Sequence, residues 1–138
     1  MSVTTYHCLC TELVLGTTVP LEDLPKRQSD ASIICKITAA ESLSQGGSVF
    51  TSAVDTDDKA VVLKLDDGFE KRYAVRCSRC GLMLGYQLDR SQFEESKEKL
   101  GRREDVVYVL PGGLQTTDEM EGGKSMEGRV EVKIGSGA

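Results

Sequence analysis

Apolar and polar residues alternate over several segments between residues 61 and 110, which is the pattern of half-buried β-strands. Residues 61–65 and 71–77 flank an Asp-Gly pair, and this dipeptide is a turn signal between two strands of a hairpin. Residues 82–88 alternate in the same way, so we expect a further strand with one buried face. Residues 106–110 are apolar on both faces and are expected to form a central strand. These patterns predict a mainly β domain.

One segment, residues 91–100, carries the signals of a helix. Ser91 is followed three residues later by Glu94, which is a capping-box start, and Gly101 stands where the helix would stop. We therefore predict one short helix there. Residues 30–43 fit helical spacing in part, but their β-branched isoleucines favour an extended segment.

The chain is expected to form one domain over residues 1–114, followed by a tail over residues 115–138. Thr, Asp, Glu, Gly, Lys and Ser dominate the tail, and this acidic, glycine-rich composition predicts a flexible, largely disordered segment. Within it, residues 130–134 alternate apolar and charged side chains, so they form either one strand or part of the disordered tail.

Composition narrows the class of protein. No run approaches the roughly 18 apolar residues of a membrane span, and the first residues lack the basic and apolar regions of a secretory signal. We therefore expect a protein that neither spans a membrane nor is secreted. The formal net charge of −5 disfavours bulk attraction to nucleic acid or anionic lipid. With no Trp, three Phe and four Tyr, the core is expected to need support beyond packing.

Four of the five cysteines form two close pairs, Cys8 with Cys10 and Cys77 with Cys80. Thiolates two or three positions apart on a tight turn reach one ion from the same side, and two such turns supply the four sulfurs of a tetrahedral zinc site. Zinc is the first-choice metal because it is redox-inert and suits soft thiolate ligands. Buried free thiols and disulfides are the alternatives, and disulfides are disfavoured in a chain without a secretory signal.

Strand-like residues surround both cysteine pairs, which places each pair at the tip of a β-hairpin. Two hairpins with such metal-binding turns, or knuckles, predict a small zinc-ribbon-like β domain with a long insertion between the knuckles. A structural zinc ion contributes on the order of 10–16 kcal/mol in small peptides, so it would offset the weak core.

The remaining cysteine and the single histidine receive structural roles. Cys35 lies between Ile34 and Lys36 and is expected to be a buried thiol that acts as a small hydrophobe. His7 precedes Cys8, and because adjacent strand residues point to opposite faces, it is expected to face away from the metal.

An enzyme is not expected. Four cysteines close the coordination shell, whereas a catalytic zinc keeps an open position, and one histidine leaves little acid–base chemistry at neutral pH. A redox enzyme that uses the paired cysteines is a third functional alternative, after the adaptor and the RNA-associated factor described below. It is disfavoured because a strand pattern follows Cys80, whereas a thioredoxin-type pair opens a helix.

Five short motifs stand in order along the chain: residues 6–10, residues 21–27 with Asp30, Arg72-Tyr73, residues 77–82, and Tyr86-Gln87. Together they resemble the STING ER exit protein (STEEP) family. The similarity runs from about residue 6 to residue 110, and the order of unlike motifs makes it more specific than the cysteines alone.

This resemblance implies a non-enzymatic adaptor that promotes membrane curvature and cargo exit from the endoplasmic reticulum in early secretory trafficking. It implies partners in the trafficking machinery, including a phosphatidylinositol 3-kinase complex, and a location in the cytoplasm and nucleus and peripherally at the endoplasmic reticulum. Animal members continue into a long charged C-terminal region, where this sequence has a short tail, so contacts of that region are not carried over. The resemblance identifies no catalytic residue.

Basic residues form local islands in this acidic chain, and five of them are candidate partner-binding residues: Lys26, Arg27, Arg72, Arg76 and Arg79. They are expected either to pair internally with carboxylates or to dock an acidic protein surface, a phosphoinositide or RNA. For Arg27 we expect an internal ion pair with Asp30 that fixes the loop after Pro25. Docking of RNA belongs to the alternative function, a nuclear zinc-ribbon factor associated with RNA or a ribonucleoprotein complex.

Overall fold

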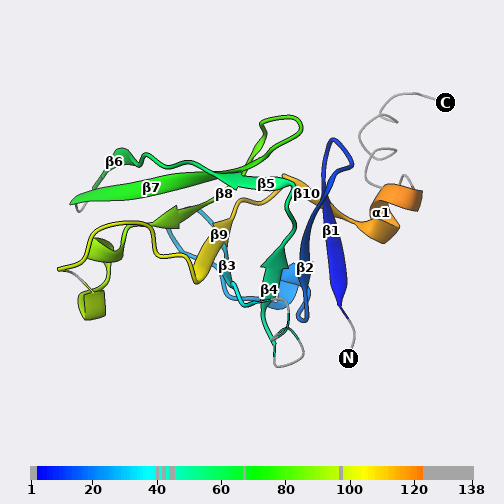
Figure 1. The fold of residues 1–138 in the computed structure, drawn as a ribbon, viewed down its shortest axis with the longest axis horizontal. Coiled ribbons are helices and arrows are strands. Elements are labelled where there is room, and N and C mark those ends of the chain that lie inside the picture. Colours follow the sequence, from blue (N-terminus) through cyan, green and yellow to red (C-terminus); the bar gives the residue numbers. More distant parts are fainter. Residues whose placement is uncertain are drawn as a thin grey trace.

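The structure is a computed structural model that describes residues 3–39, 41, 43, 46–66, 68–96 and 98–122 of the chain. Within these residues two antiparallel sheets pack together, and a short helix follows the last strand (Figure 1). The mainly β fold predicted from the sequence is confirmed.

The first sheet contains the first and last strands of the described chain. Its strands are paired in the order β10-β1-β2-β4, with the bounds β10 (Leu114–Thr116), β1 (Thr4–Cys8), β2 (Leu13–Thr17) and β4 (Ser48–Phe50). β1 and β2 form a hairpin whose register shifts between Tyr6 and His7. The turn of this hairpin carries the first cysteine pair.

The second sheet is larger and carries the second cysteine pair. Its strands are β3 (Ile33–Lys36), β9 (Val106–Val109), β8 (Met83–Leu88), β7 (Gly68–Cys77), β5 (Val54–Thr56) and β6 (Val61–Leu65). The order is β3-β9-β8-β7-β5, and β6 pairs with the first half of β7. The segment between the two knuckles therefore supplies strands to both sheets.

Several sequence predictions agree with these elements. The Asp-Gly hairpin is formed by β6 and β7, and the apolar segment at residues 106–110 becomes β9, a central strand between β3 and β8. The ambiguous segment at residues 30–43 contains the extended strand β3. The strand predicted at residues 82–88 is β8, but its predicted exposed face is wrong, because Gln87 donates to the Glu104 and Val106 carbonyls and Gly85 lies against the Tyr108 backbone.

The predicted helix at residues 91–100 is wrong. Two 3-10 turns occupy that segment, η3 (Arg90–Gln92) and η4 (Glu94–Ser96). The cap is Asp89, whose carboxylate accepts a hydrogen bond from the Ser91 backbone N–H, so the turn begins before the predicted start. Phe93 then adopts extended dihedrals (φ −115°, ψ 140°), which interrupts helical hydrogen bonding. The Arg103 guanidinium lies 4.3 Å from the Phe93 ring centroid, a tertiary contact that local pattern does not encode.

The α-helix of the described chain lies elsewhere, at α1 (Thr117–Gly122). A capping box starts it: the Thr116 N–H donates to Glu119 Oε1 at 2.8 Å, and the Glu119 N–H donates to Thr116 Oγ1 at 3.0 Å. The capping-box signal was thus present in the sequence, but at Thr116 rather than Ser91.

The predicted domain boundary at residue 114 coincides with the first residue of β10, and residues 115–122 of the predicted tail form the rest of this strand and α1. Gln115 is buried at 4% exposure, and its side-chain amide donates to the Cys8 carbonyl at 3.4 Å. Pairing with β1 is the physical reason that this polar segment is ordered. The possible strand at residues 130–134, and the rest of the predicted tail from residue 123, lie outside the described residues.

The main core lies between the sheets and uses residues of both. Its buried members are Tyr6, Cys8, Val14, Leu15, Leu21, Ile33, Cys35, Val75, Cys77, Leu84, Val107 and Val109. Leu21 belongs to the 3-10 turn η1 (Leu21–Asp23). Cys35 is fully buried, as predicted, and burial raises the pKa of its thiol to about 11. Two of the paired cysteines, Cys8 and Cys77, are thus part of the core itself.

Candidate metal centre

The first knuckle is the turn between β1 and β2. The Cys8 N–H donates to the Glu12 carbonyl at 2.8 Å, and the Thr11 N–H donates to the Cys8 carbonyl at 2.8 Å. This turn places Thr11 at φ +83°, in the left-handed region that β-branched residues rarely adopt. His7 supports the turn, because its Nδ1 donates to the Thr11 carbonyl at 2.9 Å.

The second knuckle is the turn between β7 and β8, and it repeats the design of the first. The Gly81 N–H donates to the Cys77 carbonyl at 2.8 Å, and the Cys77 N–H donates to the Leu82 carbonyl at 3.0 Å. Gly81 has φ +79°, and it occupies the same place after Cys80 that Thr11 occupies after Cys10. Each knuckle therefore needs a left-handed residue directly after its second cysteine, and only the second knuckle has glycine there.

The four sulfurs converge between the tips of the two knuckles. The Cys8 and Cys80 sulfurs are 3.5 Å apart, the Cys10 and Cys77 sulfurs are 3.7 Å apart, and all four lie within 4.8 Å of one another. Sulfurs at about 2.3 Å from a central ion, the usual zinc–thiolate distance, form a tetrahedron with edges of about 3.8 Å. A disulfide would need about 2.05 Å, and these cysteines are free. The four cysteines could therefore hold one metal ion, as the sequence predicted.

Burial divides the site into an inner and an outer pair. Cys8 and Cys77 have no exposed surface, whereas Cys10 is half-buried and Cys80 is exposed. The pKa of the Cys8 thiol is raised to about 12, chiefly by burial; the neighbouring thiols contribute to the rise, and the Cys10 backbone N–H opposes it. A bound cation favours the thiolate and would offset this cost. Since Cys8 ends β1 and Cys77 ends β7, the site joins the two sheets.

His7 lies outside this cluster, as predicted. Its Nδ1 is bonded to the Thr11 carbonyl, and its Nε2 lies 3.0 Å from the Thr117 hydroxyl. Both ring nitrogens therefore have protein hydrogen-bond partners other than the cysteines. The register shift between Tyr6 and His7 does not bring the ring to the sulfurs.

Comparison with known families bears on this arrangement. The sequence model of the STEEP1 domain matches residues 1–124, which include both knuckles, both sheets and α1. The chain belongs to the STEEP1 domain family. The resemblance noted in the sequence is therefore confirmed, and the match extends past the boundary predicted at residue 114.

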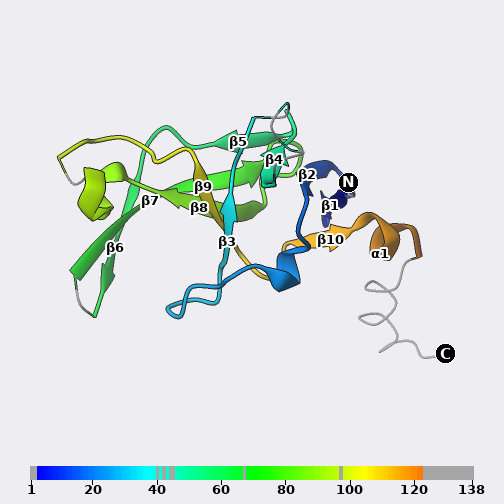
Figure 2. The ribbon, with the colours of Figure 1, turned by 90° about the horizontal axis from the view of Figure 1, so that it is seen from below.

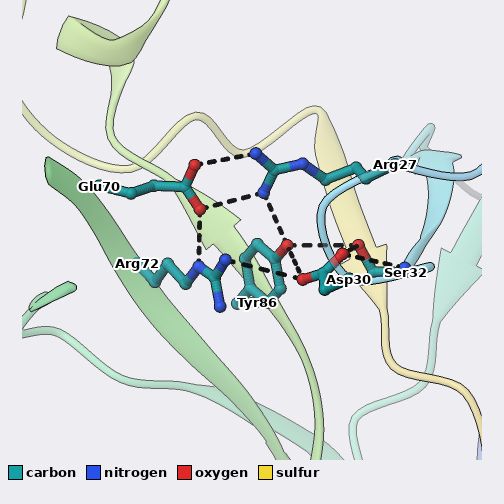
Figure 3. A network of polar contacts seen from close by, with 6 residues as sticks. All are labelled: Arg27, Asp30, Ser32, Glu70, Arg72 and Tyr86. Carbon is teal, nitrogen blue, oxygen red and sulfur yellow. Dashed lines mark hydrogen bonds and ion pairs between the residues drawn. The ribbon is translucent and has the colours of Figure 1, made fainter. Parts of the chain in front are cut away.

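The STEEP1 domain also contains a second polar cluster, away from the sulfurs, which holds two of the candidate basic residues (Figure 3). Arg27 donates to both Glu70 oxygens, at 3.0 and 2.8 Å, and to the Tyr86 hydroxyl at 2.7 Å. The ion pair predicted between Arg27 and Asp30 is thus wrong in its partner. The reason is topological. The loop that contains Arg27 folds over β7 and β8, so the Arg27 guanidinium forms a bidentate ion pair with the Glu70 carboxylate.

Asp30 belongs to the same cluster through other contacts. Its carboxylate accepts hydrogen bonds from the Ser32 hydroxyl and the Tyr86 hydroxyl, both at 2.6 Å, and lies 3.6 Å from Arg72. Arg72 also donates to Glu70 at 2.7 Å and lies over the Tyr86 ring, 4.1 Å from its centroid. We call these six residues the charge network: Arg27, Asp30, Ser32, Glu70, Arg72 and Tyr86.

The charge network is balanced and largely buried. Its two guanidinium groups face two carboxylates, and the four charged side chains are between 7% and 24% exposed. The Arg27 guanidinium, with Arg72 adding to it, holds the pKa of Glu70 below its usual range against the effect of burial. Burial also opposes ionisation of Asp30, but the hydrogen bonds from Ser32 and Tyr86 outweigh it and lower the pKa of Asp30.

The other three candidate basic residues lie at the surface. Arg76 is 3.4 Å from Asp57 and Arg79 is 3.7 Å from Glu12, with Arg side chains 44% and 61% exposed. Lys26 is exposed and pairs through its backbone with Ile33. The five basic residues are therefore not one patch, and their role in binding a partner stays a prediction.

Sequence reasoning missed Glu70, Ser32 and Tyr86 as members of the network. A signal did exist, because Glu70 directly precedes the strand predicted at residues 71–77, and two positions along an extended chain put it on the same face as Arg72. The charge on that face indicated an internal pair. The second guanidinium that pairs with Glu70 comes from Arg27, and no strand pattern in the sequence predicts where the loop that contains Arg27 lies.

The backbone of the knuckles yields a first prediction. The Gly81→Ala variant is expected to lose about 1–2 kcal/mol of unfolding free energy, because its Cβ meets no atom within 4 Å and only the positive φ is penalised. The Thr11→Gly variant is expected to gain up to about 1 kcal/mol at the matching position. Guanidinium denaturation at a fixed free zinc concentration measures both changes.

Gly113→Ala is the control, since its Cβ would have its nearest contact at 3.8 Å and its φ is ordinary. Equal losses for the variants at Gly81 and Gly113 would contradict the role assigned to the knuckle backbone.

The charge network yields a second prediction. Glu70→Gln leaves the Arg27 and Arg72 guanidiniums without their shared carboxylate and is expected to cost about 2–3 kcal/mol of unfolding free energy. Because the pKa of Glu70 is lowered by folding, its contribution is present above the ordinary pKa of about 4.3 and is lost as pH falls through the folded value. The difference between the two proteins should therefore shrink below about pH 4.

Arg76→Gln provides the comparison, because its pair with Asp57 is more than one-third exposed on both sides. We expect it to cost less than about 1 kcal/mol. A loss for Glu70→Gln no larger than that for Arg76→Gln would show that the network contributes little to stability.

Proposed function

We propose that this STEEP1-domain protein is a non-enzymatic adaptor that promotes cargo exit from the endoplasmic reticulum and membrane curvature in early secretory trafficking. The observation that carries the proposal is the family match over residues 1–124. The STEEP family is not known as an enzyme family. The four-sulfur site is compatible with a non-enzymatic role, because four protein ligands fill a tetrahedral shell and leave no open position.

The proposed partners are protein components of the trafficking machinery, including a phosphatidylinositol 3-kinase complex, as the family resemblance implies. The proposed location is the cytoplasm and nucleus, with peripheral association at the endoplasmic reticulum. In the part of the chain that the structure describes, no helix has the length and apolarity needed to cross a membrane.

We propose further that the metal is zinc and that its role is structural, held by Cys8, Cys10, Cys77 and Cys80. Four soft thiolate donors in a tetrahedral set favour zinc among the biological metals. When bound, zinc would supply a redox-inert cation that stabilises the four thiolates. The position of the ligands in the chain would make this stabilisation structural. The four cysteines lie in turns of both sheets, so the bound ion would tie one sheet to the other.

The proposed zinc site predicts about one zinc ion per chain in the purified protein, measured by inductively coupled plasma mass spectrometry. Removal of the metal with a chelator should lower the melting temperature sharply, since metal-binding free energy is folding free energy in such sites. Cys35→Ala, a buried thiol outside the cluster, is the control and should keep its zinc. A metal-free preparation with an unchanged melting curve after chelation would contradict a structural zinc.

The adaptor proposal is tested by affinity purification of the full chain at its endogenous level, with mass spectrometry of the recovered proteins. We expect trafficking components and subunits of the kinase complex, and we expect slower cargo export from the endoplasmic reticulum after deletion. Normal export together with no trafficking component would contradict the proposal.

The alternative, a nuclear zinc-ribbon factor bound to RNA, rests on the exposed Arg79 at the tip of the second knuckle. It predicts recovery of ribonucleoproteins in the same purification, with RNA binding that falls with salt and is lost in Arg76→Glu. Arg76 and Arg79 each lie beside a carboxylate, Asp57 and Glu12 respectively, which RNA phosphates would have to displace. The redox alternative also stays a prediction. A strand, β8, follows Cys80, whereas the cysteine pair of a thioredoxin-type enzyme opens a helix.

A further inference from the structure

The β6–β7 hairpin extends beyond the rest of its sheet. β8 pairs with β7 only from Arg72 to Arg76, and β5 pairs with it only from Val75 to Cys77. The first residues of β7, from Gly68, therefore have β6 as their strand partner among the described residues. Figures 1 and 2 show this two-stranded ribbon projecting away from the body of the molecule.

The outer edge of β6 carries no strand partner in the described parts of the chain. Natural edge strands are usually protected by proline, by a bulge, by several charges or by a short length. β6 pairs with β7 over five consecutive residues without a register shift, it contains no proline, and its one charged residue is Lys64. Its backbone N–H and C=O groups on this edge are therefore accessible to another extended chain.

Large apolar side chains gather on the same hairpin. Val61 and Val62 are each 58% exposed, and Phe69 is 68% exposed. In the register, Val62 lies opposite Lys71 and Lys64 lies opposite Phe69. Residues directly opposite share one face of a ribbon, so one face presents two apolar and two basic side chains.

The hairpin is held in place from its other face. Glu70 and Arg72 lie on that face and belong to the charge network, which ties β7 to the loop containing Arg27 (Figure 3). An isolated two-stranded ribbon is marginally stable in water. The network anchors its base, and the apolar face can remain exposed without folding back onto the body.

We propose that β6 binds an extended segment of a partner protein, which adds to the sheet as a further strand. Strand addition uses the open backbone edge for affinity and the side chains on each face for selectivity. We expect the partner segment to place apolar residues beside Val61 and Val62 and an Asp or Glu carboxylate beside Lys64. Lys64 has no ion-pair partner among the described residues, whereas Lys71 lies 3.9 Å from Asp89, so Lys64 is the charge that an acidic partner would satisfy.

A partner protein fits this edge better than a lipid surface does. Asp66 is exposed at the hairpin tip, and the chain carries a formal net charge of −5, which opposes approach to an anionic membrane. The inference goes beyond the trafficking role and does not depend on it, because it uses only the backbone and side chains of the hairpin.

A random-peptide display library, selected on the immobilised full-length protein, tests this inference. We expect the enriched peptides to alternate apolar residues and to carry Asp or Glu. For a synthetic copy of the best peptide, Phe69→Ser and Lys64→Glu should each weaken binding about tenfold or more by fluorescence anisotropy. Val19→Ser is the matched control, since Val19 is 40% exposed and lies outside the hairpin. Hydrogen exchange should show that the bound peptide protects β6 amides.

Four results would overturn the proposal. The first is a selection without any enriched pattern, and the second is equal binding of the peptide to the Phe69→Ser and Val19→Ser variants. The third is concentration-dependent self-association of the wild-type chain that Phe69→Ser abolishes, which would assign the edge to a second copy. The fourth is binding to phosphatidylcholine–phosphatidylserine vesicles that Phe69→Ser abolishes, which would assign the face to a membrane. Loss of the trafficking role with retained peptide binding would leave this inference standing.

Discussion

Four cysteine sulfurs converge from two hairpins that belong to different sheets, and the metal ion that we propose between them would join these sheets. Cys8 and Cys77 are fully buried and form part of the core, so the site continues the hydrophobic contact between the sheets. That core has few bulky side chains, since the chain has no Trp and its main buried cluster holds one aromatic residue, Tyr6. A site that contributes several kcal/mol at this point would compensate for what packing alone does not supply.

One strand connects the features described above. β7 runs from Gly68 to Cys77: its last residue supplies a sulfur, its middle residues Glu70 and Arg72 belong to the charge network, and its first residues form the projecting hairpin. The proposed metal would hold the Cys77 end of β7 against the first sheet, and the charge network ties Glu70 and Arg72 to the loop after η1. A strand held at these two points would support the docking edge that we propose on β6.

The sequence was most informative where a short local pattern decides the structure. The two cysteine pairs predicted the knuckles, and the Asp-Gly pair between apolar segments predicted the β6–β7 hairpin, because spacing and turn chemistry are local properties. It was least informative where a distant contact decides. Ser91 and Glu94 carry a helix start, yet Asp89 and the packing of Phe93 produce two 3-10 turns. The partner of Arg27 is Glu70 rather than Asp30, and the polar residue Gln115 is ordered by pairing with β1, for reasons that only the folded chain supplies.

The most direct test of the central claim is X-ray absorption at the zinc edge of the full-length protein, which reports the type, number and distance of the atoms around the metal. Four cysteine ligands would give a single shell of four sulfurs at about 2.3 Å. A shell with nitrogen or oxygen at about 2.0–2.1 Å in place of any of these sulfurs would contradict it, because one of the four cysteines would then lie outside the site that joins the sheets.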